Sequence, residues 1–252
     1  MQIPRRYWRN LDWPLIITVL ALTAIGMVVI YSASYSQLVA AGLNPFHYVQ
    51  RQLLAFGLGL AAMIVIISID YRAWKRWTNL IYFANIILLA SVLLIGKTVF
   101  GSQRWFRIGP LNLQPSELAK IGIVLALAKL LEKPVHKHGW KEIGRAFLLA
   151  AVPMGLIFLQ PDIGTSAVFI GLVFTMLFVV GANPKYLAIT GCGLIGAALG
   201  AILVSVKGWF QIIKPYQLTR LLVFLDPYAD RNGAGWNIIQ SMIAIGSGGF
   251  LG

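Results

Sequence analysis

"LIITVLALTAIGMVVIYSAS", residues 15–34, is a run of twenty residues without a charged side chain. A helix needs about 20 mostly apolar residues to cross the hydrocarbon core of a bilayer. Similar runs recur along the chain, and we expect transmembrane helices at 14–34, 52–69, 79–96, 117–131, 146–160, 163–181 and 186–206. The pattern therefore predicts an all-α polytopic membrane protein with about seven transmembrane helices in this chain.

The composition agrees with a membrane location. The 252 residues are 58% hydrophobic and only 12% charged, whereas about a quarter of the residues in a soluble domain are charged. The first apolar run follows three arginines and resembles a signal peptide in this respect. We favour a retained first helix, because the run is long for a signal peptide and six more apolar runs follow it.

The basic residues indicate how the helices are oriented. The net charge is +13, but the basic side chains cluster between apolar runs and not on a polar domain, which argues against nucleic-acid binding. Cytoplasmic loops carry an excess of Lys and Arg. We therefore expect a cytoplasmic N-terminus, with twelve basic residues on the cytoplasmic side: Arg5, Arg6, Arg9, Arg72, Lys75, Arg76, Lys129, Lys133, Lys137, Lys141, Arg145 and Lys185.

The chain changes character after the seventh run. Residues 207–252 contain apolar stretches that are too short to span a membrane. "PYQLTRLLVFLDP", residues 215–227, has apolar residues at helical spacing and predicts a short amphipathic helix at the membrane interface. "NGAGWNIIQSMIAIGSGG", residues 232–249, predicts a turn and a second short helix. We expect one membrane domain over 1–252, with a bundle over 14–206 and an extracytoplasmic tail over 207–252.

Small residues suggest where helices pack closely, because glycine and alanine let two backbones approach each other in lipid. We expect such contacts from Gly57, Gly59, Ala61, Ala62, Gly191, Gly193, Gly196 and Gly200. Cys192 is the only cysteine, so no internal disulfide can form, and we expect it to be buried as a small apolar side chain.

The stretch "LNLQPSELAK", residues 111–120, places two ionisable side chains at the start of an apolar run. Pro115 disfavours helix at the preceding residue, and we expect Ser116 to be the N-cap. Glu117 then lies in the first turn, where the helix dipole favours an anion, and Lys120 can pair with it. Ionisable residues within membrane segments are candidates for function.

A second Gln-Pro-acid junction, "QPDIGTS" at residues 160–166, makes Asp162 a predicted N-cap. The predicted topology places both junctions on the outer face, together with Arg104 and Arg107. Arg104, Glu117, Lys120 and Asp162 are therefore candidates to line one polar cavity that binds a lipid-linked phosphate. The alternative is a set of separately capped helix ends with solvated arginines.

No cofactor is evident in the sequence. His136 and His138 lie in a basic loop without Cys, further His or acidic residues at ligand spacing. A divalent cation could assist phosphate chemistry, but no ligand set for it is identified and we assign no metal ligands.

Several spaced motifs occur together in one order: "IYSAS", "GSQRWFRIGPLNLQPSELAK", "QPDIGTS" and "LLVFLDPYADRNGAGWNIIQSMIAIGSGGFLG". With these motifs the chain resembles the SEDS family (shape, elongation, division and sporulation), and its RodA branch more than its FtsW branch. The resemblance implies a bacterial inner-membrane bundle of ten helices. It places Arg104, Glu117, Lys120 and Asp162 in a central cavity that faces outward.

The resemblance also implies an activity and partners. Family members are glycosyltransferases that polymerise lipid II, the undecaprenyl-pyrophosphate-linked disaccharide peptide, during cell wall elongation and shape maintenance. They act with a class B penicillin-binding protein that crosslinks the strands. The family's essential Asp lies in a segment after the one that ends here with Gly252. We therefore expect either a fragment of a longer protein or a shortened, inactive copy, and assign no catalytic residue within 1–252.

Two other functions fit the same residues. A flippase or transporter for lipid-linked precursors also has charged residues at the centre of a helix bundle. A non-catalytic scaffold that docks a penicillin-binding protein is the other. A lipid II polymerisation assay in detergent distinguishes the glycosyltransferase from the flippase.

Overall fold

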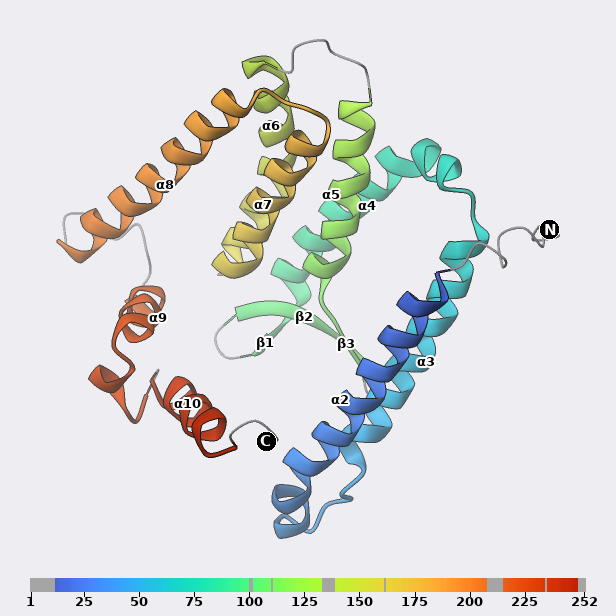
Figure 1. Cartoon of the computed structure of the whole chain (residues 1–252), viewed down its shortest axis with the longest axis vertical. Coiled ribbons are helices and arrows are strands. Elements are labelled where there is room, and N and C mark those ends of the chain that lie inside the picture. The colour runs from blue at the N-terminus through green and yellow to red at the C-terminus, as the bar shows by residue number, and fades with distance from the viewer. Residues whose placement is uncertain are drawn as a thin grey trace. The chain divides into compact units, whose positions relative to one another are not determined.

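The computed structural model describes residues 12–99, 102–109, 111–132, 139–160, 162–207, 215–233 and 235–248. The chain divides into two compact units, Met1–Gly181 and Ala182–Gly252, and each is described by itself. The helices of the first unit are α2 Trp13–Ala40, α3 His47–Ser68, α4 Tyr71–Ile95, α5 Pro115–Leu131, α6 Trp140–Leu159 and α7 Ile163–Val179. Its strands are β1 Lys97–Val99, β2 Ser102–Ile108 and β3 Leu111–Leu113. Figure 1 shows these elements along the chain.

The second unit is also helical. It consists of α8 Pro184–Val206, α9 Pro215–Leu225, the short 3-10 helix η1 Pro227–Asp230 and α10 Trp236–Gly248. Each of the seven predicted transmembrane runs thus coincides with a helix, from α2 to α8, and extends past the C-terminal end of that helix by at most two residues. Helices α2, α3, α4, α6 and α8 are long and apolar enough to cross a membrane, and α7 is a shorter apolar helix. The prediction of a polytopic helical membrane protein is confirmed.

Several helices begin earlier than predicted. Helix α3 begins at His47 and not at 52, α4 at Tyr71 and not at 79, and α6 at Trp140 and not at 146. The apolar run marks only the part of a helix that matches the hydrocarbon core. The additional turns are rich in aromatic and basic side chains, which belong at the membrane–water interface.

Polar side chains fix several helix starts. Asp12 accepts a hydrogen bond from the backbone N–H of Leu15 at 3.2 Å, and Asp70 accepts one from the N–H of Arg72 at 2.8 Å. These bonds satisfy N–H groups that have no partner within the helix itself. The carboxylates at the starts of α2 and α4 therefore act as helix caps.

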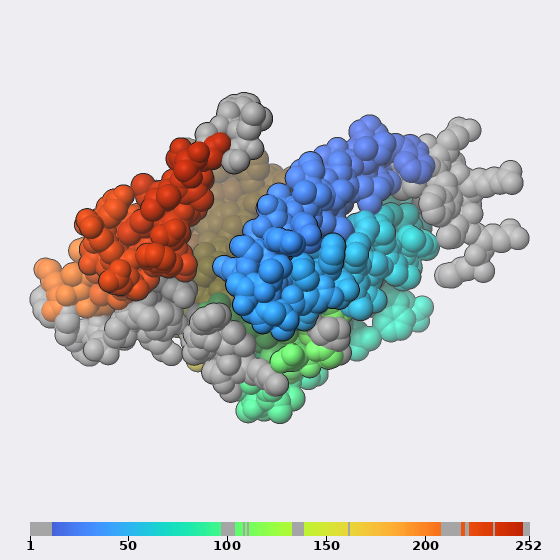
Figure 2. Space-filling view, turned by 90° about the horizontal axis from the view of Figure 1, so that it is seen from below, coloured from blue at the N-terminus to red at the C-terminus, as the bar shows by residue number. Residues whose placement is uncertain are grey.

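The core of the first unit lies among α4, α5, α6 and α7. Leu89, Ile123, Leu127, Ile157 and Phe169 are fully or almost fully buried there. In contrast, no residue in the most apolar 18-residue stretch of α2 or of α3 is buried by the rest of the described chain. These two helices lie side by side, as Figure 2 shows in blue, and their apolar side chains are available to lipid or to further protein.

Two hydrogen bonds tie α6 to α4. The Tyr82 hydroxyl donates to the carbonyl of Leu149 at 2.7 Å, and the Gln160 Nε2 donates to the carbonyl of Leu89 at 3.1 Å. Without water in the bilayer core, such polar groups need partners within the protein. Both bonds therefore help to fix the register of the two helices.

The predicted close contacts of small residues are wrong for five of the eight positions. A Cβ added at Gly57, Gly59, Gly193, Gly196 or Gly200 would meet nothing within 4 Å. The glycine that does allow close packing is Gly122 of α5, where an added Cβ would strike the side-chain amide of Asn85 in α4. A stripe of small residues shows that approach is possible, but not which helix face has a neighbour. Cys192 is also exposed, not buried as expected.

Replacement of Gly122 by leucine is expected to destabilise the α4–α5 contact by about 1–3 kcal/mol, because it overpacks a filled site. The midpoint of thermal unfolding in detergent measures the effect. Gly171→Leu is the matched control, since a Cβ at Gly171 of α7 meets nothing within 4 Å. Equal shifts for the two variants would contradict the packing described for Gly122.

A small antiparallel sheet, ordered β1-β2-β3, occupies the connection between α4 and α5. Phe106 pairs with Leu113, and Gly109 adopts a φ of +59° at the tight turn between β2 and β3. No strand or sheet was predicted for this connection from the sequence. Strand β2 contacts both α4 and α5 (Figure 1), so it holds this connection against the end of the bundle where α5 begins.

In the second unit, α9 confirms the short helix predicted from residue 215 onward. The Asp226 carboxylate accepts a hydrogen bond from the N–H of Tyr228 at 3.0 Å and caps η1. Helix α10 confirms the second short helix. The described part of the tail is therefore mostly helical, and the location of α9 at a membrane interface stays a prediction.

Candidate functional site

The four predicted site residues lie at the starts of helices α5 and α7 and on strand β2. Arg104 is part of β2, Glu117 and Lys120 lie in the first two turns of α5, and Asp162 precedes α7. Strand β3 leads into α5 through Gln114 alone. The sheet and the start of α5 are therefore placed by one short stretch of chain.

Arg104 and Asp162 form a largely buried ion pair. The Arg104 Nη1 lies 3.1 Å from the Asp162 Oδ2, and the two side chains are 23% and 11% exposed. The other carboxylate oxygen, Oδ1, accepts the N–H of Thr165 at 3.0 Å, which confirms Asp162 as the N-cap of α7. One carboxylate thus caps a helix and neutralises an arginine from a distant strand.

Glu117 and Lys120 form the second pair. The Lys120 Nζ lies 2.8 Å from the Glu117 Oε2, and the side chains are 30% and 56% exposed, respectively. An exposed pair of this kind contributes about 0–1 kcal/mol to stability. Stability alone therefore does not explain why a lysine stands at the start of an otherwise apolar helix.

The predicted N-cap role of Ser116 is wrong. Gln114 is the N-cap residue of α5 and has extended backbone geometry, and Pro115 is the first helical residue. Proline suits the first position because it lacks the N–H that would have no partner there. Ser116 lies two residues beyond this N-cap, and its hydroxyl is buried without a hydrogen-bond partner among the described residues.

Ser116→Ala is expected to leave the free energy of unfolding unchanged or to raise it by up to about 1 kcal/mol. A buried hydroxyl without a partner is a cost to the folded state, and alanine removes it at little change in volume. Thermal unfolding of the full chain in detergent measures this. A loss of more than about 1 kcal/mol would show that the hydroxyl makes a stabilising bond.

Gln160 belongs to the second Gln-Pro-acid junction, but its role was not predicted from the sequence. It is only 1% exposed and closes α6 while its amide bonds to α4. A glutamine between an apolar run and a proline resembles an ordinary loop residue in the sequence. Only the hydrogen bond to Leu89 of α4, seen in the structure, shows that Gln160 is part of the packed core beside Asp162.

Another basic side chain lies near the same end. Arg51 of α3 and Asn112 of β3 line a cavity of ≈ 430 Å³ together with Tyr48 and Gln52. The sequence did not assign Arg51 to the site. That Arg51 and Asn112 line one cavity could not be read from sequence, because no motif links α3 to β3.

The arrangement suits an anionic ligand. Helix N-termini carry partial positive charge, and α5 and α7 both begin here with Lys120 and Arg104 near their first turns. Guanidinium and ammonium groups at helix N-termini bind phosphate. The structure pairs Arg104 with Asp162 and Glu117 with Lys120; a single cavity that includes both pairs stays a prediction.

A resident metal has no visible ligand set in the described part of the chain. No group of three or more His, Cys, Asp or Glu side chains there is placed to hold a metal ion. His136 and His138 lie outside the described residues.

Comparison with known proteins gives consistent matches along nearly the whole chain. The profile of the FtsW/RodA/SpoVE family, described as a cell cycle protein, matches residues 12–252. A relative from Thiomicrospira cyclica, named a probable peptidoglycan glycosyltransferase FtsW, is 34% identical over 248 residues, which cover 97% of this chain and 61% of the relative. The chain thus spans about three fifths of the length of that relative.

Two solved structures resemble the fold. One is described as "Structural coordination of polymerization and crosslinking by a peptidoglycan synthase complex"; it is 38% identical, has a TM-score of 0.75 and covers 96% of this chain and 67% of that one. The other is the rod shape determining protein RodA of Thermus thermophilus, 35% identical with a TM-score of 0.62, covering 77% of this chain and 60% of that one.

Proposed function

Because this chain belongs to the FtsW/RodA/SpoVE family, the SEDS proteins, we propose that it acts in lipid II polymerisation as a peptidoglycan glycosyltransferase. The observation that supports the site is the Arg104–Asp162 ion pair beside the start of α7, with Lys120 at the start of α5. Relatives that carry the name of this enzyme match the same stretch of chain. The substrate would be the undecaprenyl-pyrophosphate-linked disaccharide peptide.

The chemistry explains the basic side chains. When a glycosidic bond forms, the lipid pyrophosphate leaves and gains negative charge, and cations placed in advance stabilise that charge. Arg104 and Lys120 are our proposed pyrophosphate contacts. Asp162 and Glu117 orient these two cations through the bonds described above.

The attacking sugar hydroxyl needs a general base, and we assign that role to no residue of 1–252. Activity assays should therefore use the protein as its gene encodes it.

Within the family we propose the RodA type, which acts in elongation and cell shape. The motifs quoted from the sequence support this choice, as does the fold shared with a solved RodA. The named relative is an FtsW of similar identity, so identity does not separate the two. Rescue of rod shape in cells depleted of RodA is expected; rescue only of cells depleted of FtsW would contradict it.

We further propose a cytoplasmic N-terminus and docking of a class B penicillin-binding protein. The clusters of basic residues before α2 and at the start of α4 support the orientation. A solved relative is described as a synthase complex that coordinates polymerisation and crosslinking. Co-purification with the class B protein checks the partner.

The direct test is polymerisation of labelled lipid II by the purified protein in detergent, without any other enzyme. A ladder of glycan strands is the expected product. A flippase moves lipid II between leaflets but makes no strand, and a scaffold retains its partner but makes none. Intact lipid II after incubation with well-folded protein would therefore overturn the proposal.

A further inference from the structure

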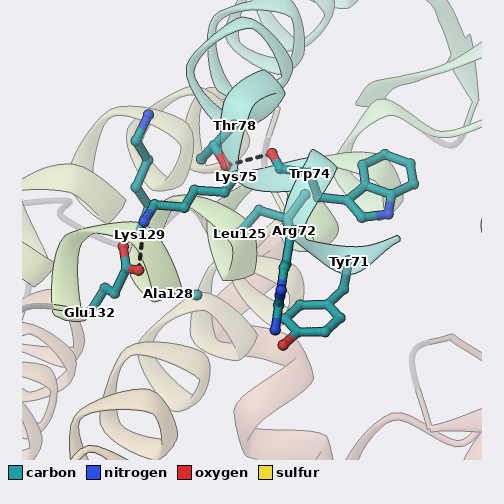
Figure 3. A pocket seen from close by; sticks show the side chains of 9 residues that line it. All are labelled: Tyr71, Arg72, Trp74, Lys75, Thr78, Leu125, Ala128, Lys129 and Glu132. Carbon is teal, nitrogen blue, oxygen red and sulfur yellow. Dashed lines mark hydrogen bonds and ion pairs between the residues drawn. The ribbon is translucent and has the colours of Figure 1, made fainter. Parts of the chain in front are cut away.

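A second cationic region lies at the other end of α5, away from the proposed active site. The first turns of α4 and the last turns of α5 enclose an open pocket of ≈ 530 Å³. Figure 3 shows the side chains that line it. They are Tyr71, Arg72, Trp74, Lys75, Thr78, Leu125, Ala128, Lys129 and Glu132.

The lining combines apolar and cationic groups. Leu125, Ala128 and Trp74 supply carbon surface, whereas Arg72, Lys75 and Lys129 supply three positive charges. Glu132 is the one acid, so three cations against one acid leave the lining with a net charge of +2. A pocket of this kind fits a ligand that carries both an anion and an apolar part.

The existing contacts of the cations leave room for such a ligand. Lys75 reaches from α4 to Glu132 at 2.6 Å (Figure 3), but both side chains are more than half exposed, at 57% and 53%. Such exposed pairs contribute little to stability, so a phosphate can compete with Glu132 for Lys75 at small cost. An ammonium group also has three donors, and one bond does not exhaust them.

The other two cations are restrained by neighbouring side chains. Lys129 donates to the Asn79 Oδ1 at 3.0 Å, and the Arg72 guanidinium lies over the Tyr71 ring at 5.8 Å. The Asn79 amide is neutral, so Lys129 brings its positive charge to the pocket.

The depth of the pocket matches the membrane interface. Tyr71 begins α4, and Thr78 lies seven residues further on, which is about 10 Å along a helix. Tyrosine and tryptophan at helix ends lie at the level of the lipid headgroups. A free anion would gain nothing from the apolar part of this lining.

We propose that this pocket binds an anionic phospholipid. Its phosphate contacts Arg72, Lys75 and Lys129, and the first part of its acyl chains lies on Leu125 and Ala128. Basic pockets between transmembrane helices bind anionic headgroups by the same chemistry. The proposal does not depend on the glycosyltransferase activity, and with the proposed orientation the lipid belongs to the inner leaflet.

The test is lipid binding to the full chain in neutral detergent, followed by native mass spectrometry during titration with phosphatidylglycerol. We expect saturable binding of phosphatidylglycerol and much weaker binding of phosphatidylcholine. The triple variant R72Q/K75Q/K129Q should weaken phosphatidylglycerol binding by at least about tenfold, because each basic residue near a membrane surface contributes about fivefold. The matched control K141Q/R145Q/K185Q removes the same charge outside the pocket and should stay within about twofold.

A variant that binds phosphatidylglycerol more tightly is a further test, because misfolding cannot explain a gain of affinity. Glu132→Gln raises the net charge of the lining from +2 to +3, and binding of phosphatidylglycerol should tighten about fivefold. Equal binding of phosphatidylcholine, equal loss in the control triple variant, or no gain in Glu132→Gln would each overturn the proposal. Complete displacement of the lipid by equimolar inorganic phosphate would show a site for free phosphate instead.

Discussion

Asp162→Ala should lower the free energy of unfolding by about 2–4 kcal/mol. Loss of an N-cap costs about 1 kcal/mol. The larger part comes from Arg104, whose side chain is 23% exposed and would lose its carboxylate partner. Removing one member of a buried ion pair leaves an uncompensated charge, and partial exposure reduces this cost here.

Asp162→Asn separates the two contributions. Asparagine is as good an N-cap as aspartate, so this variant keeps the bond to the N–H of Thr165 and loses only the ion pair. Unfolding in detergent of both variants, each with and without Arg104→Gln, completes a double-mutant cycle. Full stability of Asp162→Asn would contradict the energetic role given to the ion pair.

Lys120→Ala should lower lipid II polymerisation by about 100-fold or more and leave stability almost unchanged. Its pair with Glu117 is exposed enough to contribute little to folding. Removal of one group that stabilises developing negative charge costs about 10²–10³ in rate. The measurement is initial polymerisation rate together with thermal unfolding, on the protein as its gene encodes it.

Two variants control for charge and for the partner of Lys120. Lys141→Ala removes a lysine from the start of α6 and should retain the rate within about twofold. Glu117→Gln keeps the cation and should lower the rate much less than Lys120→Ala. An unchanged rate for Lys120→Ala would remove Lys120 from the proposed pyrophosphate contacts.

The helices could be predicted from sequence because length and apolarity decide whether a segment spans a bilayer. The predicted runs are found as α2 to α8, and Asp162 caps α7 as its position before the apolar run indicated. Such features depend on a few neighbouring residues. For the same reason the pairing of Glu117 with Lys120, one turn apart, could be anticipated.

What could not be predicted depends on contacts between distant segments. The bond from Gln160 to Leu89 joins residues 71 positions apart, and Gly122 meets Asn85 because of how α4 crosses α5. The sheet between α4 and α5 forms from strands of three to seven residues, too short to give a clear alternation. Ser116 failed as a cap because the helix already begins at Pro115, two residues before the start that a Ser116 cap requires.

Binding of lipid II at the start of α5 can be tested directly by locating where lipid II touches this helix. A photo-crosslinking amino acid is placed at Leu118, beside the Glu117–Lys120 pair, or at Leu130, near the other end of the helix. The two positions are equally exposed, at 38% and 37%, and lie about 18 Å apart along the helix. Labelled lipid II is expected to crosslink at 118 and not at 130. Equal crosslinking at both, as a flippase would give, or crosslinking at 130 alone, would contradict it.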